Sequence, residues 1–193
     1  RSQINNELSE KILDKSNILE KDMTAHDQEH SVEVQLPWLQ YFFEKVNFVP
    51  ISLNAGLMGS TGFKDVGNAI KESTSEIERD VVIIASSDFT HFGDNYAYTP
   101  VGGPLENKLD YIEKVDKEAA EKITELDPEG FLGVIEEYNA TICGYGPIAS
   151  MLYSLRDVAS EGKIAEYTTS YEVSGDVNSI VGYCGITISK KQF

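Results

Sequence analysis

A cluster of polar side chains at residues 86–93 (SSDFTHFG) is the first candidate for chemistry. Asp88 and His91 lie three positions apart, directly after residues 80–85 (DVVIIA), whose β-branched character predicts a strand buried on both faces of a parallel sheet. Ligands of open α/β sheets bind beyond the carboxyl ends of the strands, where this cluster would lie. Two interpretations stay open: the pair serves catalysis, or Asp88 caps a turn and His91 only bonds to it.

Cys143 and His30 add two further ligand types. Cys143 lies in a glycine-flanked turn before a predicted helix, where free N–H groups and the helix dipole favour a thiolate. His30 follows Glu29 at a predicted helix start. A thiolate, two imidazoles and nearby carboxylates suit iron, copper or zinc. Taken singly, such a cysteine is more often a small buried hydrophobe, and such a histidine a helix-start hydrogen-bonding group.

The rest of the chain predicts alternating helices and strands. Helices are predicted over residues 4–15, 30–45, 62–78, 105–126, 128–138 and 147–160, and strands over 48–53, 80–85, 165–173 and 179–189. Pro37 is expected to kink the second helix, with Trp38, Phe42 and Phe43 on its core face. Tyr96 and Tyr98, in a long loop, either line a pocket or cover loop backbone. The alternation predicts an α/β fold with a mainly parallel sheet and helices on both faces.

Composition limits the partners. The 193 residues include 16 basic and 32 acidic side chains, a formal charge of -16, whereas surfaces for nucleic acid or anionic membrane need clustered cations. No apolar segment is long enough to span a bilayer. Two distant cysteines, without a CxxC motif or signal peptide, predict a reducing, cytoplasmic setting. A start at Arg1 leads us to expect that the sequence belongs to a longer one.

Three ordered segments resemble the Memo family, which includes AmmeMemoRadiSam system protein B and is related to the LigB-type (class III) extradiol dioxygenases. They are residues 29–37 (EHSVEVQLP), 86–93 (SSDFTHFG) and 141–148 (TICGYGPI), with 126–128 (LDP) between the last two. The resemblance spans nearly the whole chain. It implies one Memo-like α/β domain over residues 1–193, folded as a three-layer αβα sandwich with a mainly parallel or mixed sheet.

The same resemblance implies a mononuclear iron or copper pocket at the strand ends. Residues matching His30 and Cys143 are metal ligands in the family, and those matching Asp88 and His91 stand beside the metal. His91 is therefore expected to act as an acid/base or oxygen-orienting group, a role that suits an imidazole. The residues expected to line this pocket are Glu29, Ser87 and Tyr145.

Two departures from the family pattern accompany the resemblance. The family's Gly-Pro-Ser-His-His motif, which carries another histidine ligand, has no match here, so the chain resembles a member without its N-terminal strands. Tyr145-Gly146 stands where the family often has Arg-His. The resemblance implies a metal-dependent oxidoreductase, dioxygenase-like, acting on a small molecule. The alternatives are a non-enzymatic module that binds a phosphopeptide or protein in the same pocket, and a scaffold with a degenerate site.

Overall fold

The computed structural model describes residues 2–27, 29–159 and 161–189 of the chain. Its α-helices are α1 (Asn6–Lys15), α2 (Leu36–Phe42), α3 (Ala55–Ser75), α4 (Leu105–Thr124), α5 (Pro128–Tyr138), α6 (Tyr145–Leu155) and α7 (Ser170–Ser174). Its strands are β1 (Ser2–Ile4), β2 (Val46–Phe48), β3 (His91–Phe92), β4 (Glu161–Thr169) and β5 (Ile180–Ser189). Short 3-10 turns are η1 (Thr24–His26), η2 (Glu33–Gln35) and η3 (Asp94–Tyr96).

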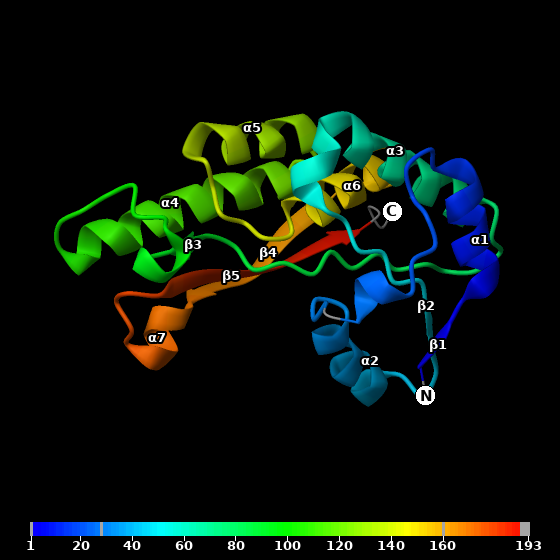
Figure 1. The fold of residues 1–193 in the computed structure, drawn as a ribbon, viewed down its shortest axis with the longest axis horizontal. Helices are drawn as coiled ribbons and strands as arrows, with labels where there is room; N and C mark the ends of the chain where they lie inside the picture. The colour runs from blue at the N-terminus through cyan, green and yellow to red at the C-terminus, as the bar shows by residue number, and fades with distance from the viewer. Residues whose placement is uncertain (1, 28, 160, 190–193) are drawn as a thin grey trace.

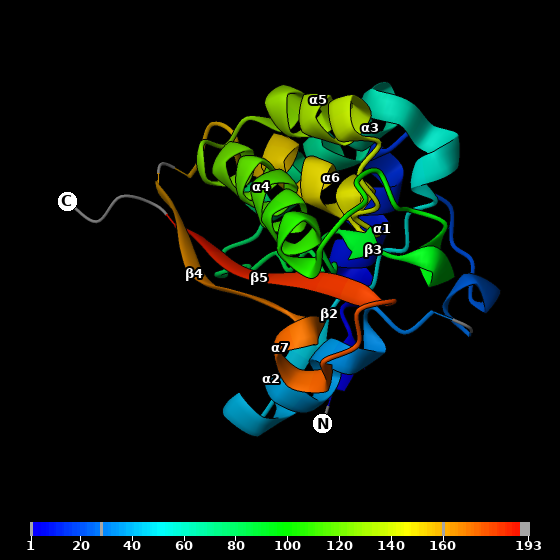
Figure 2. The same ribbon diagram turned by 90° about the vertical axis from the view of Figure 1, so that its left-hand side faces the viewer.

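The strands form two small sheets in an α/β arrangement. β1 pairs with β2 in parallel, whereas β3, β5 and β4 form an antiparallel sheet in that order. Among these strands the pairing is therefore mixed and not mainly parallel. Figures 1 and 2 show α3, α4, α5 and α6 gathered on one side of the long β4–β5 ribbon, with α2 and α7 on the other.

Local signals fix α5 where the sequence predicts it. The Asp127 side chain accepts a hydrogen bond from the Gly130 amide at 2.9 Å and so caps the helix. Pro128 occupies the first turn, where its missing N–H is not needed, and Asn139 ends the helix in the left-handed conformation. The helices then bury one main core, which includes Phe63, Phe131 and Leu152.

The strand predicted over residues 80–85 is not formed. These residues belong to no helix or strand, and the side chains of Val82 and Ile84 are 83% and 50% exposed. A strand exists only where a neighbour supplies its hydrogen bonds, and within the described chain residues 80–87 make no backbone–backbone hydrogen bond. The chain joins β5 only afterwards, where the Phe89 amide donates to the Gly182 carbonyl at 2.9 Å.

The structure also differs from the helix predicted over residues 30–45, since it contains η2 followed by the shorter α2. Pro37 does not kink a long helix; it lies in the first turn of α2, which begins at Leu36. Trp38, Phe42 and Phe43 are 66%, 69% and 58% exposed, so they are not core residues in this structure. The apolar spacing is real: Val32, Leu36 and Leu39 are half-buried, whereas the three aromatic side chains are left largely uncovered by the described chain.

Other boundaries differ by a few residues. α3 begins before the predicted position 62 and contains a break at Gly59, whose φ of 62° is in the region that favours glycine. The strand predicted to begin at residue 165 is β4, which begins at Glu161. Within the described residues, no helix combines the length and apolar character that crossing a membrane would require.

Candidate metal centre

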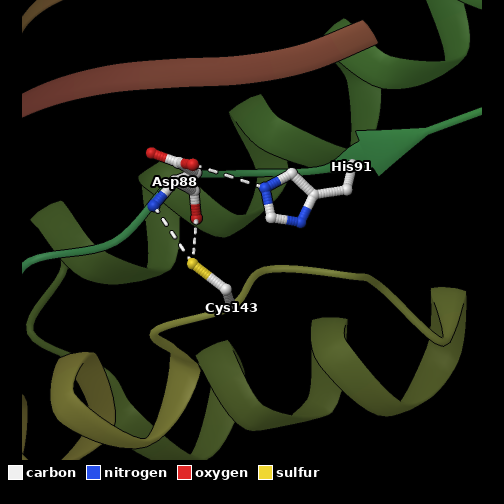
Figure 3. A group of neighbouring side chains, drawn as sticks. All are labelled: Asp88, His91 and Cys143. Atoms are coloured by element: carbon white, nitrogen blue, oxygen red, sulfur yellow. Dashed lines mark hydrogen bonds and ion pairs between the residues drawn. The ribbon is translucent and has the colours of Figure 1, made fainter. Parts of the chain in front are cut away.

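Asp88, His91 and Cys143 bring their side chains together (Figure 3). One ligand atom from each lies within 4.8 Å of the other two. Asp88 Oδ2 lies 3.4 Å from His91 Nε2, and the Asp88 amide donates to Cys143 Sγ at 3.4 Å. Asp88 and His91 are half-buried, whereas Cys143 is exposed. The Cys143 sulfur also lies 3.9 Å from the Asp88 carbonyl oxygen, so both backbone groups of Asp88 contact it.

Thr141 ties the two halves of this cluster together. Its hydroxyl accepts a hydrogen bond from the His91 amide at 2.8 Å and donates one to the His91 carbonyl at 2.7 Å. His91 lies in β3, which pairs with β5, and Cys143 lies two residues after Thr141 in the loop before α6. One hydroxyl thus fixes the imidazole-bearing strand against the thiol-bearing loop.

Replacing Thr141 with valine is expected to lower the free energy of unfolding by about 1–2 kcal/mol, because both partly buried backbone groups of His91 lose their partner while the side-chain volume is kept. Urea titration measures this effect. Thr124→Val is the matched control, since its hydroxyl only bonds back to the Glu121 carbonyl within α4. Equal losses in the two variants would contradict the role given to Thr141.

Ser87 makes the second connection between the turn and the loop. Its hydroxyl accepts from the Gly144 amide at 2.8 Å and donates to the Asp88 carbonyl at 2.6 Å, and its oxygen lies 3.8 Å from Cys143 Sγ. A Cβ on Gly144 would lie 2.5 Å from the Ser87 Cβ, so the close approach depends on glycine. Ser87, which was predicted to line the pocket, thus contacts the sulfur of Cys143.

Tyr96 and Tyr98, the two tyrosines of the predicted loop, lie in different surroundings. The Tyr96 ring stacks on the His91 ring, with centroids 4.9 Å apart and an interplanar angle of 22°. The Tyr96 hydroxyl accepts a hydrogen bond from Ser179 at 3.0 Å. Tyr98 is instead buried, and its hydroxyl donates to the Tyr138 carbonyl at 2.7 Å. Tyr96 therefore borders the cluster and Tyr98 belongs to the core.

Asp116 is a buried carboxylate behind the cluster that the sequence analysis missed. Oδ1 accepts from the Thr90 amide at 3.0 Å, and Oδ2 accepts from the Tyr167 hydroxyl at 3.0 Å. Burial raises the pKa of Asp116 to about 6, although these hydrogen bonds and the nearby His91 act in the opposite direction. Since Thr90 directly precedes His91, Asp116 holds the backbone that carries the imidazole.

A signal for Asp116 is present in the sequence. Helical spacing places it on the same face of α4 as Ile112, Val115, Ala119 and Ala120, all of which are buried. An acidic residue on an apolar helix face is either paired or functional. The spacing alone does not reveal the partners, because they come from β4 and from the turn before β3.

Three other predicted site residues are not among the three whose ligand atoms converge. His30 has a side chain that is 79% exposed, with Glu33 at 4.0 Å. The Glu29 carboxylate accepts a hydrogen bond from the Ser31 amide at 2.7 Å, which is the main cause that lowers the pKa of Glu29. Tyr145 begins α6 and packs edge-on against Phe63 at 5.8 Å. The ligand role of His30 and the pocket-lining roles of Glu29 and Tyr145 stay predictions.

The two cysteines differ in their surroundings. Cys143 is exposed at the cluster, whereas Cys184 is half-buried in β5 against the main core. Burial, followed by the charge of Asp116, raises the pKa of Cys184 to about 11.

Comparison with known proteins identifies the class of protein that carries this site. Residues 1–187 match the family described as Memo-like protein. MEMO1 family proteins from Methanopyrus kandleri, Thermococcus onnurineus and Methanothermobacter thermautotrophicus are 36%, 38% and 39% identical to this chain. The matches cover 97%, 97% and 96% of this chain, and 62%, 66% and 61% of the respective relatives.

The chain belongs to the Memo family, as its three segments predict. It spans somewhat less than two thirds of the length of these relatives.

Proposed function

We propose that Asp88, His91 and Cys143 hold a transition-metal ion, iron or copper, in a metal-dependent oxidoreductase that acts on a small molecule. The observation that carries this proposal is the convergence of three different donor atoms within 4.8 Å. The family's relation to LigB-type dioxygenases supports the reaction class, and we extend to the complete domain the three-layer αβα sandwich that the resemblance implies.

The donor chemistry fits such an ion. Thiolate and imidazole ligands suit iron, copper and zinc, and a carboxylate is compatible with all three. Donors bound to one ion at about 2.0–2.3 Å lie within about 4.6 Å of each other, close to the observed limit of 4.8 Å. The Asp88 amide, 3.4 Å from the sulfur, holds Cys143 beside the other two donors.

Residues of the chain would position the ligands of the metal and leave the metal open to a small molecule. When bound, the metal provides Lewis acidity and one-electron redox chemistry. Tyr96 covers one face of His91, and Thr141 fixes its backbone so that Nε2 stays 3.4 Å from Asp88 Oδ2. The exposed Cys143 leaves one side open for a small molecule to approach.

Metal retention tests the proposal. The chain is loaded anaerobically with Fe(II), or separately with Cu(II), and then dialysed, and the bound metal is measured by mass spectrometry. Cys143→Ala is expected to lose the metal and the visible thiolate-to-Cu(II) absorption band. Asp88→Ala and His91→Ala are expected to lose most of the metal. His26→Ala is the control, and His30→Ala tests the further ligand that the resemblance implies.

The metal content of these variants distinguishes residues that bind the metal from residues that transfer protons beside it. Wild-type metal content in Cys143→Ala would overturn the proposed centre. Retention by His91→Ala and Asp88→Ala, with loss only in Cys143→Ala, would instead assign the Asp88–His91 pair to proton transfer beside the metal, the role that the family resemblance implies.

A further inference from the structure

Asp116 is fully buried at a point where four segments of the chain meet. It lies in α4, which runs along the β4–β5 ribbon (Figures 1 and 2). Its carboxylate accepts hydrogen bonds from the Thr90 amide, in the turn before β3, and from the Tyr167 hydroxyl of β4. The fourth segment is β5, because a Cβ on Gly182 would lie only 1.9 Å from Asp116 Oδ2. The carboxylate therefore connects α4, β4 and β5 with the turn that carries the site.

The backbone of Thr90 depends on this carboxylate. Its carbonyl accepts a hydrogen bond from the Gly182 amide at 2.9 Å, whereas its amide points the other way and donates to Asp116 Oδ1 at 3.0 Å. Thr90 is fully buried, so water cannot replace Asp116 as the acceptor. Asp88 and His91 lie two residues before and one residue after Thr90. The position of Thr90 therefore governs the separation of these two donors.

A buried carboxylate holds this turn at a cost to stability. Burial raises the pKa of Asp116 to about 6, which means that folding disfavours its ionised form. The ionised form nevertheless makes the stronger contacts, since hydrogen bonds to a charged acceptor are about twice as strong as neutral ones. Burial, followed by the charge of Asp116, raises the pKa of Tyr167, so the phenol stays a hydrogen-bond donor. Groups kept in such unfavourable surroundings are characteristic of functional sites.

We propose that Asp116 is a positioning residue of the metal centre, which fixes Thr90 and thereby sets the separation of the Asp88 and His91 donors. Tyr167 holds the carboxylate in place, and Gly182 leaves the space that it occupies. The proposal rests on the proposed function where metal binding is the readout, whereas the placement of His91 is measured without a metal. It assigns α4, which contributes no donor atom to the cluster, a part in building the site.

Copper binding at pH 7.5 is the first test. The dissociation constant for Cu(II) is measured by competition with a chelator. Asp116→Asn is expected to raise it about tenfold, because an amide has one acceptor oxygen for two donors and carries no charge. Asp116→Leu removes both acceptors and is expected to raise it up to about a hundredfold. Tyr167→Phe leaves the Thr90 contact in place and is expected to have a smaller effect in the same direction. The thiolate-to-Cu(II) band is expected to shift in all three variants.

Val115→Ala is the control for lost stability. Val115 precedes Asp116 in α4, is fully buried in the main core and donates no hydrogen bond to the turn from its side chain. The variant leaves a cavity and is expected to unfold at a lower urea concentration than Asp116→Asn. It is nevertheless expected to bind Cu(II) as the wild type does. A purely structural role for Asp116 would instead make metal binding follow stability in both variants.

The metal-free chain provides the second test. The His91 ring stacks on Tyr96, so the magnetic resonance signals of its ring protons respond to small displacements of the imidazole. Asp116→Asn is expected to move these signals, and Val115→Ala to leave them in place. The signal of His26, which is not among the clustered residues, is the internal reference.

Three results would overturn the proposal. They are unchanged Cu(II) binding in Asp116→Asn, an equal weakening in Val115→Ala, and unmoved His91 signals in Asp116→Asn. If Asp116→Leu does not fold, Asp116→Asn and Tyr167→Phe decide the question. A wild-type chain that holds no metal would overturn the proposed function alone, because the His91 signals then decide whether Asp116 positions the imidazole.

Discussion

Asp116→Asn is expected to gain about 3 kcal/mol of stability relative to the wild-type chain as the pH rises from about 3 to about 7, since each pKa unit is worth about 1.4 kcal/mol. Burial raises the pKa of Asp116 from the ordinary 3.8 to about 6. Between these values the folded wild type keeps a proton that the unfolded chain has released. Its stability contribution therefore falls as pH rises and is lowest above the folded pKa. Asparagine does not ionise and escapes this penalty.

Urea titrations of both proteins at several pH values measure the difference. Asp157→Asn is the control, because Lys71 pairs with Asp157 and lowers the pKa of that carboxyl. A lowered pKa stabilises the folded state above the unfolded value, so Asp157→Asn is expected to lose stability relative to wild type as pH rises. A pH-independent difference between wild type and Asp116→Asn would show that the carboxyl is not protonated on folding.

Replacing Gly144 with alanine is expected to lower the free energy of unfolding by about 1–3 kcal/mol through overpacking. The added Cβ would lie 2.5 Å from Ser87 Cβ, 2.6 Å from Ser87 Oγ and 2.8 Å from the Ser86 carbonyl oxygen. The loop would have to move away from the turn, which carries Cys143 away from Asp88. Metal retention is therefore expected to fall about tenfold to a hundredfold, the usual cost of disturbing the groups that orient ligands.

Gly133→Ala separates this effect from a general response to alanine. A Cβ at Gly133 would meet no atom within 4 Å outside the backbone of its own helix and its two chain neighbours, and the residue lies inside α5. That variant is expected to gain up to about 1 kcal/mol from helix propensity and to retain metal as the wild type does. Thermal unfolding and metal analysis of the two variants provide the comparison. A Gly144→Ala protein with wild-type retention would mean that the turn and loop can separate without consequence for the site.

Local sequence signals predicted the helices well where they are self-contained. The Asp127-Pro128 start and the Asn139 end place α5 within the predicted range. The prediction of a strand at residues 80–85 was wrong for a different reason. Its apolar composition indicates burial between neighbours, but a strand is defined by partners remote in sequence, and the described chain supplies none for this segment. Trp38 on α2 shows the same limitation, since periodicity identifies an apolar face without identifying what covers it.

The features of the site also divide into those that the sequence predicts and those that it does not. Position after an apolar run singles out Asp88 and His91, and a glycine-flanked turn before a helix singles out Cys143; their ligand atoms lie together in the structure. His30, expected as a ligand as well, is not among the residues that come together. The stack of Tyr96 on His91 and the hydroxyl of Thr141 depend on loop conformation, which no short-range pattern encodes. Asp116 carries a readable signal as an acid on an apolar helix face, but its contact with the Thr90 amide is visible only in three dimensions.

The unequal burial of the two cysteines has a practical consequence. At neutral pH an alkylating reagent needs both access and a deprotonated sulfur, and Cys184 offers neither readily, with its half-buried thiol and a pKa raised to about 11. Cys143 is open to solvent. A maleimide probe therefore attaches selectively at Cys143, giving a spectroscopic label beside His91 without removal of the second thiol.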